Sequence, residues 1–485
     1  MKKIYLFLLS ALALTTTTSC EDFLDVRPKG EKVENDQFET ASGYEDAIYG
    51  VYGYIGDQSL YGMDMLWAVP EVLAQNFKGS STEMGDLAKY KYEENSALES
   101  RFSKIWTRAY TAIGYANNIL QNLEGKSPAD FPLYNLYRGE MLGVRAMLHF
   151  DLLRYFAPTD HSKRGIPYVK TFNFSVKPFS TVGECFDYII ADLTEAESLI
   201  AGEEVIVYPR NNEQYENFNN WRETHMNVYA IKALLARVYW YKGDMAKAAE
   251  YAEAVINSNR FPLVEPTQVQ DHIAGVLSNE ETIFGIYSQE YLSFCSDYLY
   301  NYTSFKSYCV YANISDKESY PQAWSEVYNK DVSSTSQDFR KNYFRNANSI
   351  VKCLKLVDYP TIENNNVSTR PELIPGISLI NVSEMYLIAA DALLESNYSK
   401  ALSYFNAETT SRGLTPLTTE TLTADRIYNE YHKEMFGEGQ HWFNMKRLNK
   451  DIISNAESRT IPANESIYVL PIPQEEFEYR PEDNK

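Results

Sequence analysis

Residues 226–258 read MNVYAIKALLARVYWYKGDMAKAAEYAEAVINS, and residues 380–413 read INVSEMYLIAADALLESNYSKALSYFNAETTSRG. Each stretch is typical of a helix, a tight turn and a second helix. The turns are expected at Gly243 and at Asn397, residue types that commonly interrupt a helical pattern. The sequence therefore predicts two helical hairpins and favours a mainly α-helical protein.

Small residues occur in both hairpins where two helices must approach each other, at Ala248 and Ala249 in the first and at Ala401 in the second. A helical hairpin of about 34 residues is similar to the tetratricopeptide unit. The two copies begin about 150 residues apart, so they do not form a tandem array in the sequence. Degenerate copies are expected among the helices that precede them.

Three further helices are predicted before the first hairpin, at 102–124, 134–156 and 182–200. The last of these opens at Thr181 with Glu184 three residues later, which is a capping-box arrangement. The predicted fold is mainly α, with tetratricopeptide-like hairpins as a scaffold and long irregular loops with minor β structure carrying the ligand site. The expected helical units lie near 41–124, 134–200, 225–258 and 380–413.

Residues 260–375 have a different composition, which is rich in Tyr, Asn, Ser and Pro, and they show little helical periodicity. Residues 201–224 form a second irregular insert. Long connections in a compact protein are usually functional or disordered, and the aromatic content here argues against disorder. We therefore expect 260–375 to be the ligand region, displayed on a rigid scaffold.

The N-terminus resembles the leader of a bacterial lipoprotein. Two lysines precede a short apolar run and a small polar stretch, and Cys20 follows. Residues 1–19 are predicted to be the signal peptide, Cys20 the lipidated residue and 20–40 a tether, with 41–485 as a single domain that ends in a C-terminal segment, 425–485. The alternative is an ordinary secretory signal in which the cysteine is incidental.

The chain is acidic, with 66 Asp and Glu against 45 Lys and Arg and a formal net charge of −21. Loss of Lys2 and Lys3 with the leader would take the charge to −23. Nucleic acid is disfavoured as a partner, because its binding requires basic patches. The 39 tyrosines suit contact surfaces such as those that pack on sugar rings, although most of them are expected at helix–helix contacts.

Four cysteines follow Cys20, and none of them forms a CxxC pair. Cys295 and Cys309 could form a disulfide across a short loop, and the alternative is that both are buried free thiols.

Sequence motifs of the common enzyme classes are missing. The six histidines form no HExxH motif, no GxSxG motif occurs, and the glycine-rich strings lack the required spacing. A glycosidase carboxylate pair cannot be recognised from spacing. The motif search therefore predicts no cofactor and no metal, and it leaves a glycoside hydrolase open.

Four strings along the chain match the conserved segments of a known family. They are CEDFLDVRPKG at 20–30, GEMLGVRAMLHFDLLRYFA at 139–157, RIYNEYHKEMFGEGQHWFNMKRL at 426–448 and YVLPIPQEEF at 468–477. These strings, which occur in the family's order over most of the chain, resemble the SusD/RagB-type family of outer-membrane lipoproteins. At 426–448 the usual Arg and Asp of the family's motif are replaced by His441 and Asn444, which weakens that local match.

The resemblance implies a surface-exposed lipoprotein, held in the outer membrane by its N-terminal lipid and facing the cell exterior. Members of the family bind glycans and pass them to a SusC-like TonB-dependent transporter, and they are not enzymes. The same resemblance implies that ligand residues come from the loop after the first helix and from the irregular middle region.

Within those regions we select residue types that suit sugar binding, since flat rings pack on sugars and polar side chains bind hydroxyl groups. Alternatively, Trp324 is a core residue, and Tyr298 and Tyr300 lie on one face of a strand. The predicted stacking residues are Trp67, Tyr298, Tyr300 and Trp324, and the predicted hydroxyl-binding residues are Glu71 and Asn76.

Two other functions remain open. A peptide ligand would be favoured by a deep groove lined with Asn, and a glycan by an exposed arc of aromatic rings. A surface glycoside hydrolase would require two carboxyl groups about 5–10 Å apart in a cleft.

Overall fold

The computed structural model describes residues 37–77, 81–202, 217–271, 280–289, 291–299, 327–328, 337–347, 350–353, 355–356, 376–418, 421–454, 456–478 and 480. The chain divides into two compact units, Met1–Tyr44 and Glu45–Lys485, and the second unit is the subject here. The predicted signal peptide, Cys20 and most of the predicted tether lie outside the described residues.

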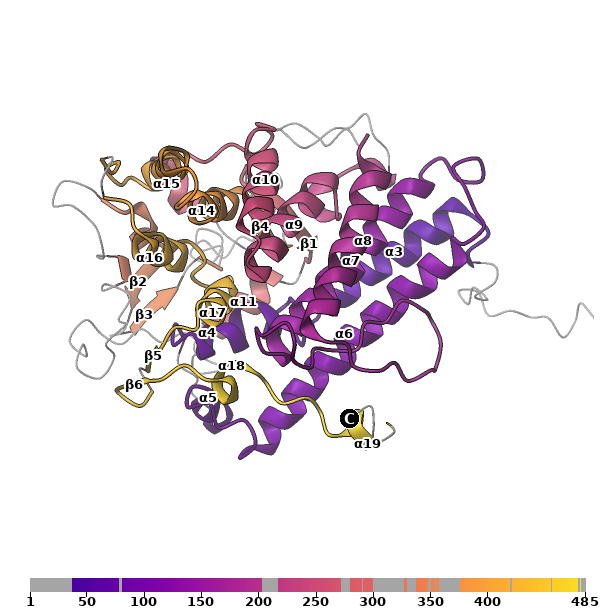
Figure 1. Ribbon diagram of the computed structural model, residues 1–485, viewed down its shortest axis with the longest axis horizontal. Coiled ribbons are helices and arrows are strands. Elements are labelled where there is room, and N and C mark those ends of the chain that lie inside the picture. Colours follow the sequence, from indigo (N-terminus) through magenta and orange to yellow (C-terminus); the bar gives the residue numbers. More distant parts are fainter. Residues whose placement is uncertain are drawn as a thin grey trace, which may run out of the picture. The chain divides into compact units, whose positions relative to one another are not determined.

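The second unit is built on a row of helices in which each packs against the next (Figure 1). The helices predicted at 102–124, 134–156 and 182–200 are confirmed, as are both hairpins. In chain order the row consists of α6 (Ser96–Asn122), α7 (Tyr134–Phe156), α8 (Val182–Ile200), α9 (Val228–Lys242), α10 (Met245–Ile256), α14 (Val382–Leu393) and α15 (Tyr398–Ser411).

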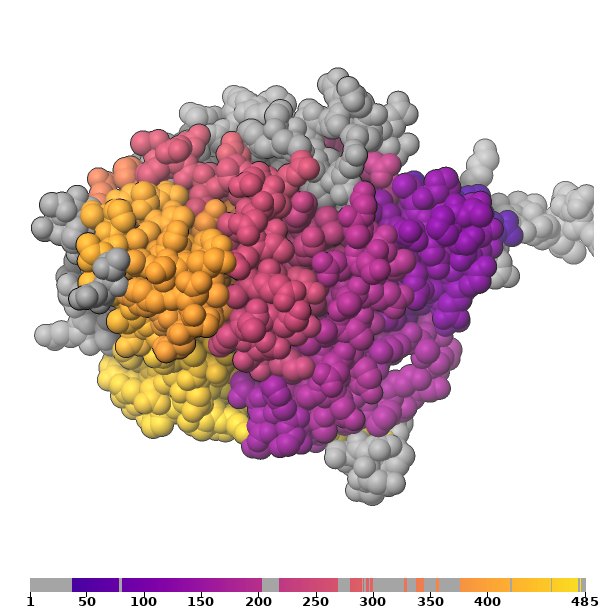
Figure 2. All heavy atoms as spheres, turned by 45° about the horizontal axis from the view of Figure 1, so that its top comes forward, coloured from indigo at the N-terminus to yellow at the C-terminus, as the bar shows by residue number. Residues whose placement is uncertain are grey.

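The two hairpins are neighbours in space although they are separated in the sequence, because α10 packs directly against α14. Figure 2 shows the orange α14–α15 hairpin beside the pink α9–α10 hairpin. The row of helices is therefore continuous, and the segment between α10 and α14 is an insertion into it.

Local sequence signals explain where the hairpin helices begin and end. Gly243 ends α9 with φ at +93°, a left-handed conformation that glycine adopts without the steric cost of a Cβ. Asp244 then caps α10 by accepting a hydrogen bond from the Lys247 N–H at 3.1 Å. Asn397 caps α15 in the same way, and Thr181 and Glu184 form the predicted capping box of α8.

Helix α7 is buried almost all round, so its polar side chains all need partners. Arg145 donates two hydrogen bonds to the Asp192 carboxylate on α8, at 2.7 and 2.8 Å. Glu140 pairs with Arg222 at 2.7 Å and accepts a hydrogen bond from the Tyr52 hydroxyl at 2.8 Å. These pairs tie α7 to its neighbours at defined positions.

Shorter elements surround the row of helices. The strands pair antiparallel as β1 with β4, β2 with β3 and β5 with β6. They are β1 (Thr282–Tyr287), β2 (Phe344–Ala347), β3 (Ile350–Cys353), β4 (Gly376–Asn381), β5 (Ile452–Ser454) and β6 (Arg459–Ile461). The helices are α3 (Ala41–Ile55), the π-helix η2 (Asp64–Ala68), α4 (Val69–Leu73), α5 (Thr82–Leu87), α11 (Tyr291–Leu299), α16 (Ala424–Glu434), α17 (Gln440–Arg447), α18 (Glu465–Tyr468) and α19 (Glu475–Glu478), with 3₁₀ turns η3 (Asn217–Asn219), η4 (Arg222–Thr224), η5 (Pro266–Asp271) and η7 (Phe339–Tyr343).

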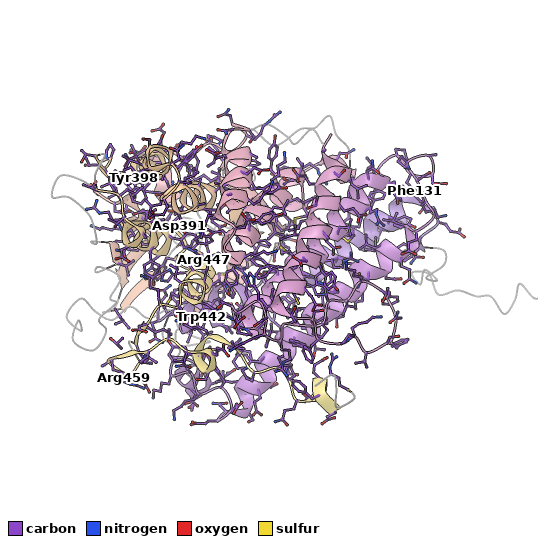
Figure 3. All side chains as sticks on the ribbon, in the orientation of Figure 1. Phe131, Asp391, Tyr398, Trp442, Arg447 and Arg459 are labelled. Carbon is purple, nitrogen blue, oxygen red and sulfur yellow. The ribbon has the colours of Figure 1, made fainter. Side chains whose placement is uncertain are left out.

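Helix α17 docks on the scaffold through both apolar and polar contacts. Trp442 and Phe443 are buried. Lys446 donates hydrogen bonds to the carbonyl oxygens of Arg154 and Ala157, at the C-terminal end of α7. Arg447 lies beside Asp391 of α14, 2.8 Å from its carboxylate (Figure 3). These contacts hold α17 against α7 and α14.

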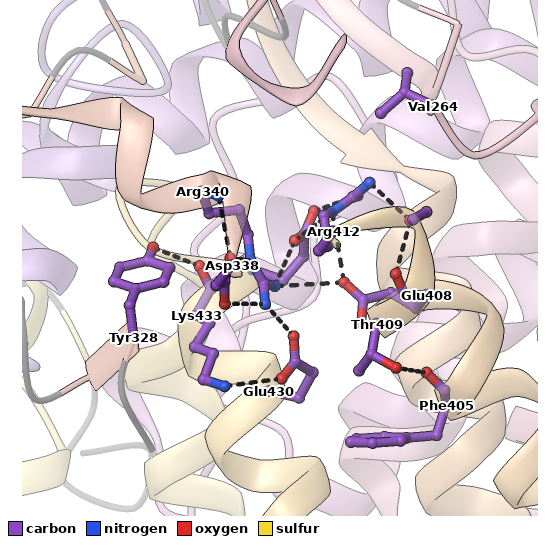
Figure 4. Close-up of polar contacts among 12 residues, drawn as sticks. Val264, Tyr328, Asp338, Arg340, Phe405, Glu408, Thr409, Arg412, Glu430 and Lys433 are labelled. Carbon is purple, nitrogen blue, oxygen red and sulfur yellow. Dashed lines mark hydrogen bonds and ion pairs between the residues drawn. The ribbon is translucent and has the colours of Figure 1, made fainter. Parts of the chain in front are cut away.

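A buried network of charges joins α15, α16 and the segment around η7 (Figure 4). Arg340 and Arg412 both contact the Glu434 carboxylate, at 2.9 Å and 2.7 Å. Burial acts to raise the pKa of Glu434, but the two guanidinium groups outweigh it and hold that pKa well below its usual range. By contrast, burial and the nearby Glu430 raise the pKa of Glu408 well above its usual range.

Across the described residues, no helix combines the length and the apolar character needed to cross a membrane.

Candidate functional site

A cavity of about 850 Å³ lies where three segments of the second unit meet. One wall is the turn after α3, the second is a polar face of α6, and the third runs from the end of β1 into α11. The lining residues are Gly56, Asp57, Gln58, Ser59, Gly62, Ser103, Lys104, Thr107, Arg108, Ser288, Tyr291, Phe294 and Asp297. Hydroxyl groups, charges of both signs and two aromatic rings therefore face one space.

The turn after α3 is held rigidly by its own polar groups. The Asp57 carboxylate accepts a hydrogen bond from the Ser59 N–H at 2.8 Å, and the Asp57 carbonyl accepts bonds from the N–H groups of Leu60 and Gly62. A Cβ at Gly62 would lie 2.4 Å from the carbonyl oxygen of Gly56, so only glycine fits there. This wall of the cavity is thus preorganised for a ligand.

The wall formed by α6 carries two cationic side chains four residues apart, Lys104 and Arg108. The Arg108 guanidinium lies 3.1 Å from the Asp57 carboxylate and 4.6 Å above the ring of Tyr54. That ring in turn makes an edge-to-face contact with Tyr115, at 5.1 Å between centroids. The aromatic pair fixes the plane of the guanidinium at the edge of the cavity.

Helix α11 supplies the apolar part of the cavity. The Phe294 ring is half-buried and lines the space, and the largely buried Tyr291 also lines it. Tyr287 ends β1 beside Ser288 and is 54% exposed, so a further aromatic ring is available near this wall. Flat apolar rings of this kind pack on the C–H faces of organic ligands.

The structure places Trp67 beneath this wall, where it is fully buried. The residue lies in the π-helix η2, its indole N–H donates to the Gly62 carbonyl at 3.2 Å, and its ring contacts Phe294 and Tyr298. A stacking residue must present one ring face to the ligand, and Trp67 presents none. Trp67 was expected from the sequence to stack on the ligand, but in the structure it lies in the interior and supports both walls of the cavity.

Glu71 and Asn76 are also interior residues rather than surface hydroxyl-binding groups. Glu71 accepts hydrogen bonds from the Gly439 N–H at 2.8 Å and from the Asn76 side chain at 2.9 Å, and Asn76 also contacts His432. Burial raises the pKa of Glu71 to about 7, against the opposing effect of these hydrogen bonds. Both side chains join α4 to the C-terminal helices, and this is a structural role that the sequence-based assignment missed.

Tyr298 is the predicted stacking residue that remains closest to the cavity. It is half-buried on α11 and packs against Phe294 at 4.5 Å between ring centroids. Burial raises the pKa of Tyr298, opposed by the nearby Arg101. The alternative expectation of a strand is wrong for Tyr298, while Tyr300 and Trp324 lie outside the described residues.

The sequence-based analysis missed Asp57, Lys104 and Arg108. A signal for the last two was present, because they share the polar face of a helix whose buried face was recognised. Cys309, the partner of Cys295 in the disulfide considered from the sequence, lies outside the described residues. Cys295 is a fully buried free thiol whose pKa is raised by burial, which agrees with the alternative interpretation for this residue.

No group of three or more His, Cys, Asp or Glu side chains in the described parts of the chain is arranged to hold a metal ion. The site as described is a half-open cavity on a helical-repeat scaffold, lined for non-covalent binding. This combination of fold and site defines a class of helical-repeat binding proteins with an inserted ligand region.

Comparison with known families identifies the class. The family described as "Starch-binding associating with outer membrane" matches residues 22–240, and the SusD family matches residues 296–482. This chain belongs to the SusD/RagB family.

Individual relatives agree with this assignment. The chain is 24% identical to "SusD-like protein P2" of Formosa agariphila, over 90% of this chain and 89% of that protein. The crystal structure of a SusD superfamily protein from Bacteroides thetaiotaomicron has a TM-score of 0.71 at 22% identity and covers 91% of this chain and 98% of its own. Surface glycan-binding protein A from the same organism, solved in complex with laminarihexaose, has a TM-score of 0.63 at 16% identity, over 90% of this chain and 97% of its own. At these identities the structural matches establish the shared fold.

Proposed function

We propose that this protein binds oligo- or polysaccharide in the cavity between α3, α6 and α11 and delivers it to a SusC-like TonB-dependent transporter. The observation that carries the proposal is the make-up of the cavity. Two of its three walls come from the loop after the first helix and from the middle region, the two segments that the family resemblance implies for ligand binding.

The chemistry of the lining suits a saccharide. Ser59, Ser103, Thr107 and Ser288 offer hydroxyl groups, and Gln58 offers an amide, all of which can exchange hydrogen bonds with sugar hydroxyls. Phe294 offers an apolar ring for the C–H face of a sugar. A stacked ring contributes about 1 kcal/mol beyond the burial of its area, so several contacts are needed for useful affinity.

The location of the protein forms part of the same proposal. Lipidation at Cys20 would hold the chain in the outer membrane, with the ligand site facing the cell exterior. This is supported by the lipoprotein-like leader and by the family description, which names association with the outer membrane. The transporter is proposed from the family resemblance.

Calorimetric titration of the full chain in mild detergent tests the proposal, using plant, host and microbial polysaccharides and their oligosaccharides. We expect one glycan class to bind, and Phe294→Ala to weaken its binding about fivefold, which is about 1 kcal/mol. Phe174→Ala is the matched control, because Phe174 is a fully exposed aromatic residue that does not line the cavity.

Two outcomes would overturn the proposal. Binding of a peptide library with no binding of any glycan would assign the cavity to peptides. Release of shorter sugars during incubation with the bound glycan would indicate a hydrolase, and Asp57→Asn and Asp297→Asn would then identify the carboxyl groups. Under the binding proposal no glycan is hydrolysed, and neither carboxyl group has a catalytic role.

A further inference from the structure

The cavity contains an unusual pair of positive charges for so acidic a chain. Acids outnumber bases by 66 to 45 overall, yet α6 presents Lys104 and Arg108 side by side on one wall. Residues four apart lie on the same helix face, and like charges at that spacing repel each other. A bound anionic group would relieve this repulsion.

Lys104 has no partner for its charge in the described structure. Its side chain is exposed on α6, and within the described ranges no Asp or Glu forms an ion pair with it. The neighbouring Arg101, by contrast, is committed to Asp64 and to Glu83 on α5. Lys104 is therefore available to a ligand.

Arg108 keeps hydrogen-bonding capacity as well. Its pairing with Asp57 uses one terminal nitrogen at 3.1 Å, and its Nε, which is buried, has no hydrogen-bond partner among the described residues. The Asp57 carboxylate is already shared with the Ser59 N–H. Guanidinium is the group best suited to binding planar or tetrahedral oxyanions through several N–H bonds, and stacking on Tyr54 orients it.

The remaining charged residue of the lining is Asp297, on α11, across the cavity from the α6 wall. The cavity thus has an acid on each of two walls and both of its cations on the third. One acid is already engaged by Arg108. The α6 wall is positive, whereas the chain as a whole is strongly negative.

We propose that the saccharide bound in this cavity carries an anionic group, a uronic carboxylate or a sulfate ester, which Lys104 and Arg108 bind together. The inference rests on the proposed glycan-binding function and adds the charge of the ligand. The sugar ring would lie toward Phe294, while the hydroxyls of Ser103 and Thr107, on the same helix, accept or donate the nearest hydrogen bonds.

The test is calorimetric titration of the full chain with oligosaccharides matched in length: neutral, uronic-acid-containing and sulfated. We expect one of the two anionic sets to bind at least tenfold more tightly than the neutral set, because hydrogen bonds to charged groups exceed those to neutral groups by this order. The two anionic arms distinguish carboxylate from sulfate recognition. This preference for the anionic oligosaccharide should decrease as the NaCl concentration is raised, because the charges of Lys104 and Arg108 are partly exposed.

Lys104→Gln is the informative variant, because its side chain is exposed and its loss should not disturb folding. It should remove most of the preference for the anionic ligand. Arg108→Lys keeps the charge but loses the planar fork, and it should weaken anion binding while the thermal unfolding temperature stays near that of wild type. Lys126→Gln, on the exposed turn after α6, changes the net charge equally and serves as the control.

Each outcome is decisive. Equal affinity for neutral and anionic sets, or an equal effect of Lys104→Gln on both, would overturn the charge inference and leave the glycan-binding proposal intact. Failure of every saccharide to bind would overturn both.

Discussion

A buried ion pair links the two hairpins, and its removal should destabilise the protein strongly. Arg237 on α9 donates to both carboxylate oxygens of Glu384 on α14, at 2.9 and 2.5 Å, and also to the carbonyl of Leu379 at 3.0 Å. The Arg237 and Glu384 side chains are 6% and 1% exposed. We predict that Arg237→Met lowers the free energy of unfolding by about 4 kcal/mol, since breaking a buried pair leaves the other charge uncompensated.

The size of this predicted destabilisation depends on the hydrogen bonds that the Glu384 carboxylate retains. After the substitution its buried carboxylate would keep a hydrogen bond from the Tyr431 hydroxyl, at 2.9 Å, but would lose its ion pair with Arg237. Replacing both charges with apolar side chains removes that penalty. The double variant Arg237→Met with Glu384→Leu should therefore unfold within about 1 kcal/mol of wild type.

The assay is urea unfolding followed by tryptophan fluorescence, since Trp240 lies on α9 close to the pair. Lys247→Met is the matched control, because it breaks a pair with Glu250 on α10 whose side chains are 46% and 60% exposed. It should cost less than about 1 kcal/mol. If Arg237→Met cost no more than this control, or if the double variant were as unstable as the single one, the reasoning would be refuted.

Two further predictions concern residues beneath the cavity. Trp67→Ala should lower the free energy of unfolding by about 3–5 kcal/mol, because it leaves a void in the core, and it should weaken glycan binding by displacing Phe294. Trp67→Phe should retain most of the stability and most of the glycan affinity, measured in the same unfolding and titration assays. Glu71 has a folded pKa of about 7 against an ordinary value of 4.5, so the folded state holds a proton that the unfolded state loses between these values. The stabilisation from this proton is complete below pH 4.5 and is lost by about pH 7, a change of about 3 kcal/mol in the free energy of unfolding. When the free energy of unfolding is measured over that pH range, it should change less with pH for Glu71→Gln than for wild type.

The helical scaffold could be predicted from the sequence because its signals are local. Gly243, Asp244 and Asn397 each end or begin a helix through bonds to residues within a few positions, and the structure has them where the pattern indicates. The packing of the two hairpins against each other could not be predicted in this way. It depends on contacts such as Arg237 with Glu384, which are 147 residues apart in the chain.

The errors in the candidate site have the same origin. Glu71 looks like an available carboxylate in the sequence, but its partner, the Gly439 N–H, lies 368 residues away. Helix α11 was missed for a different reason. Tyr291, Phe294, Tyr298 and their neighbours follow a helical spacing, while Tyr298 and Tyr300 taken alone suggest the alternation of a strand.

The walls of the cavity come from different parts of the fold, and this has a consequence for ligand specificity. Lys104 and Arg108 stand on α6, whose far face is locked in the core by residues such as Ile105 and Ala109, so their positions are set by the scaffold. The opposite wall comes from the inserted segment between α10 and α14. Substitutions in that insert can change which sugar shape fits, whereas the sign of the charge recognised is tied to the helix. Transplanting the segment around α11 from a relative should therefore alter the preferred glycan while the preference for an anionic group persists, and loss of that preference on transplantation would show that the insert, and not α6, controls it.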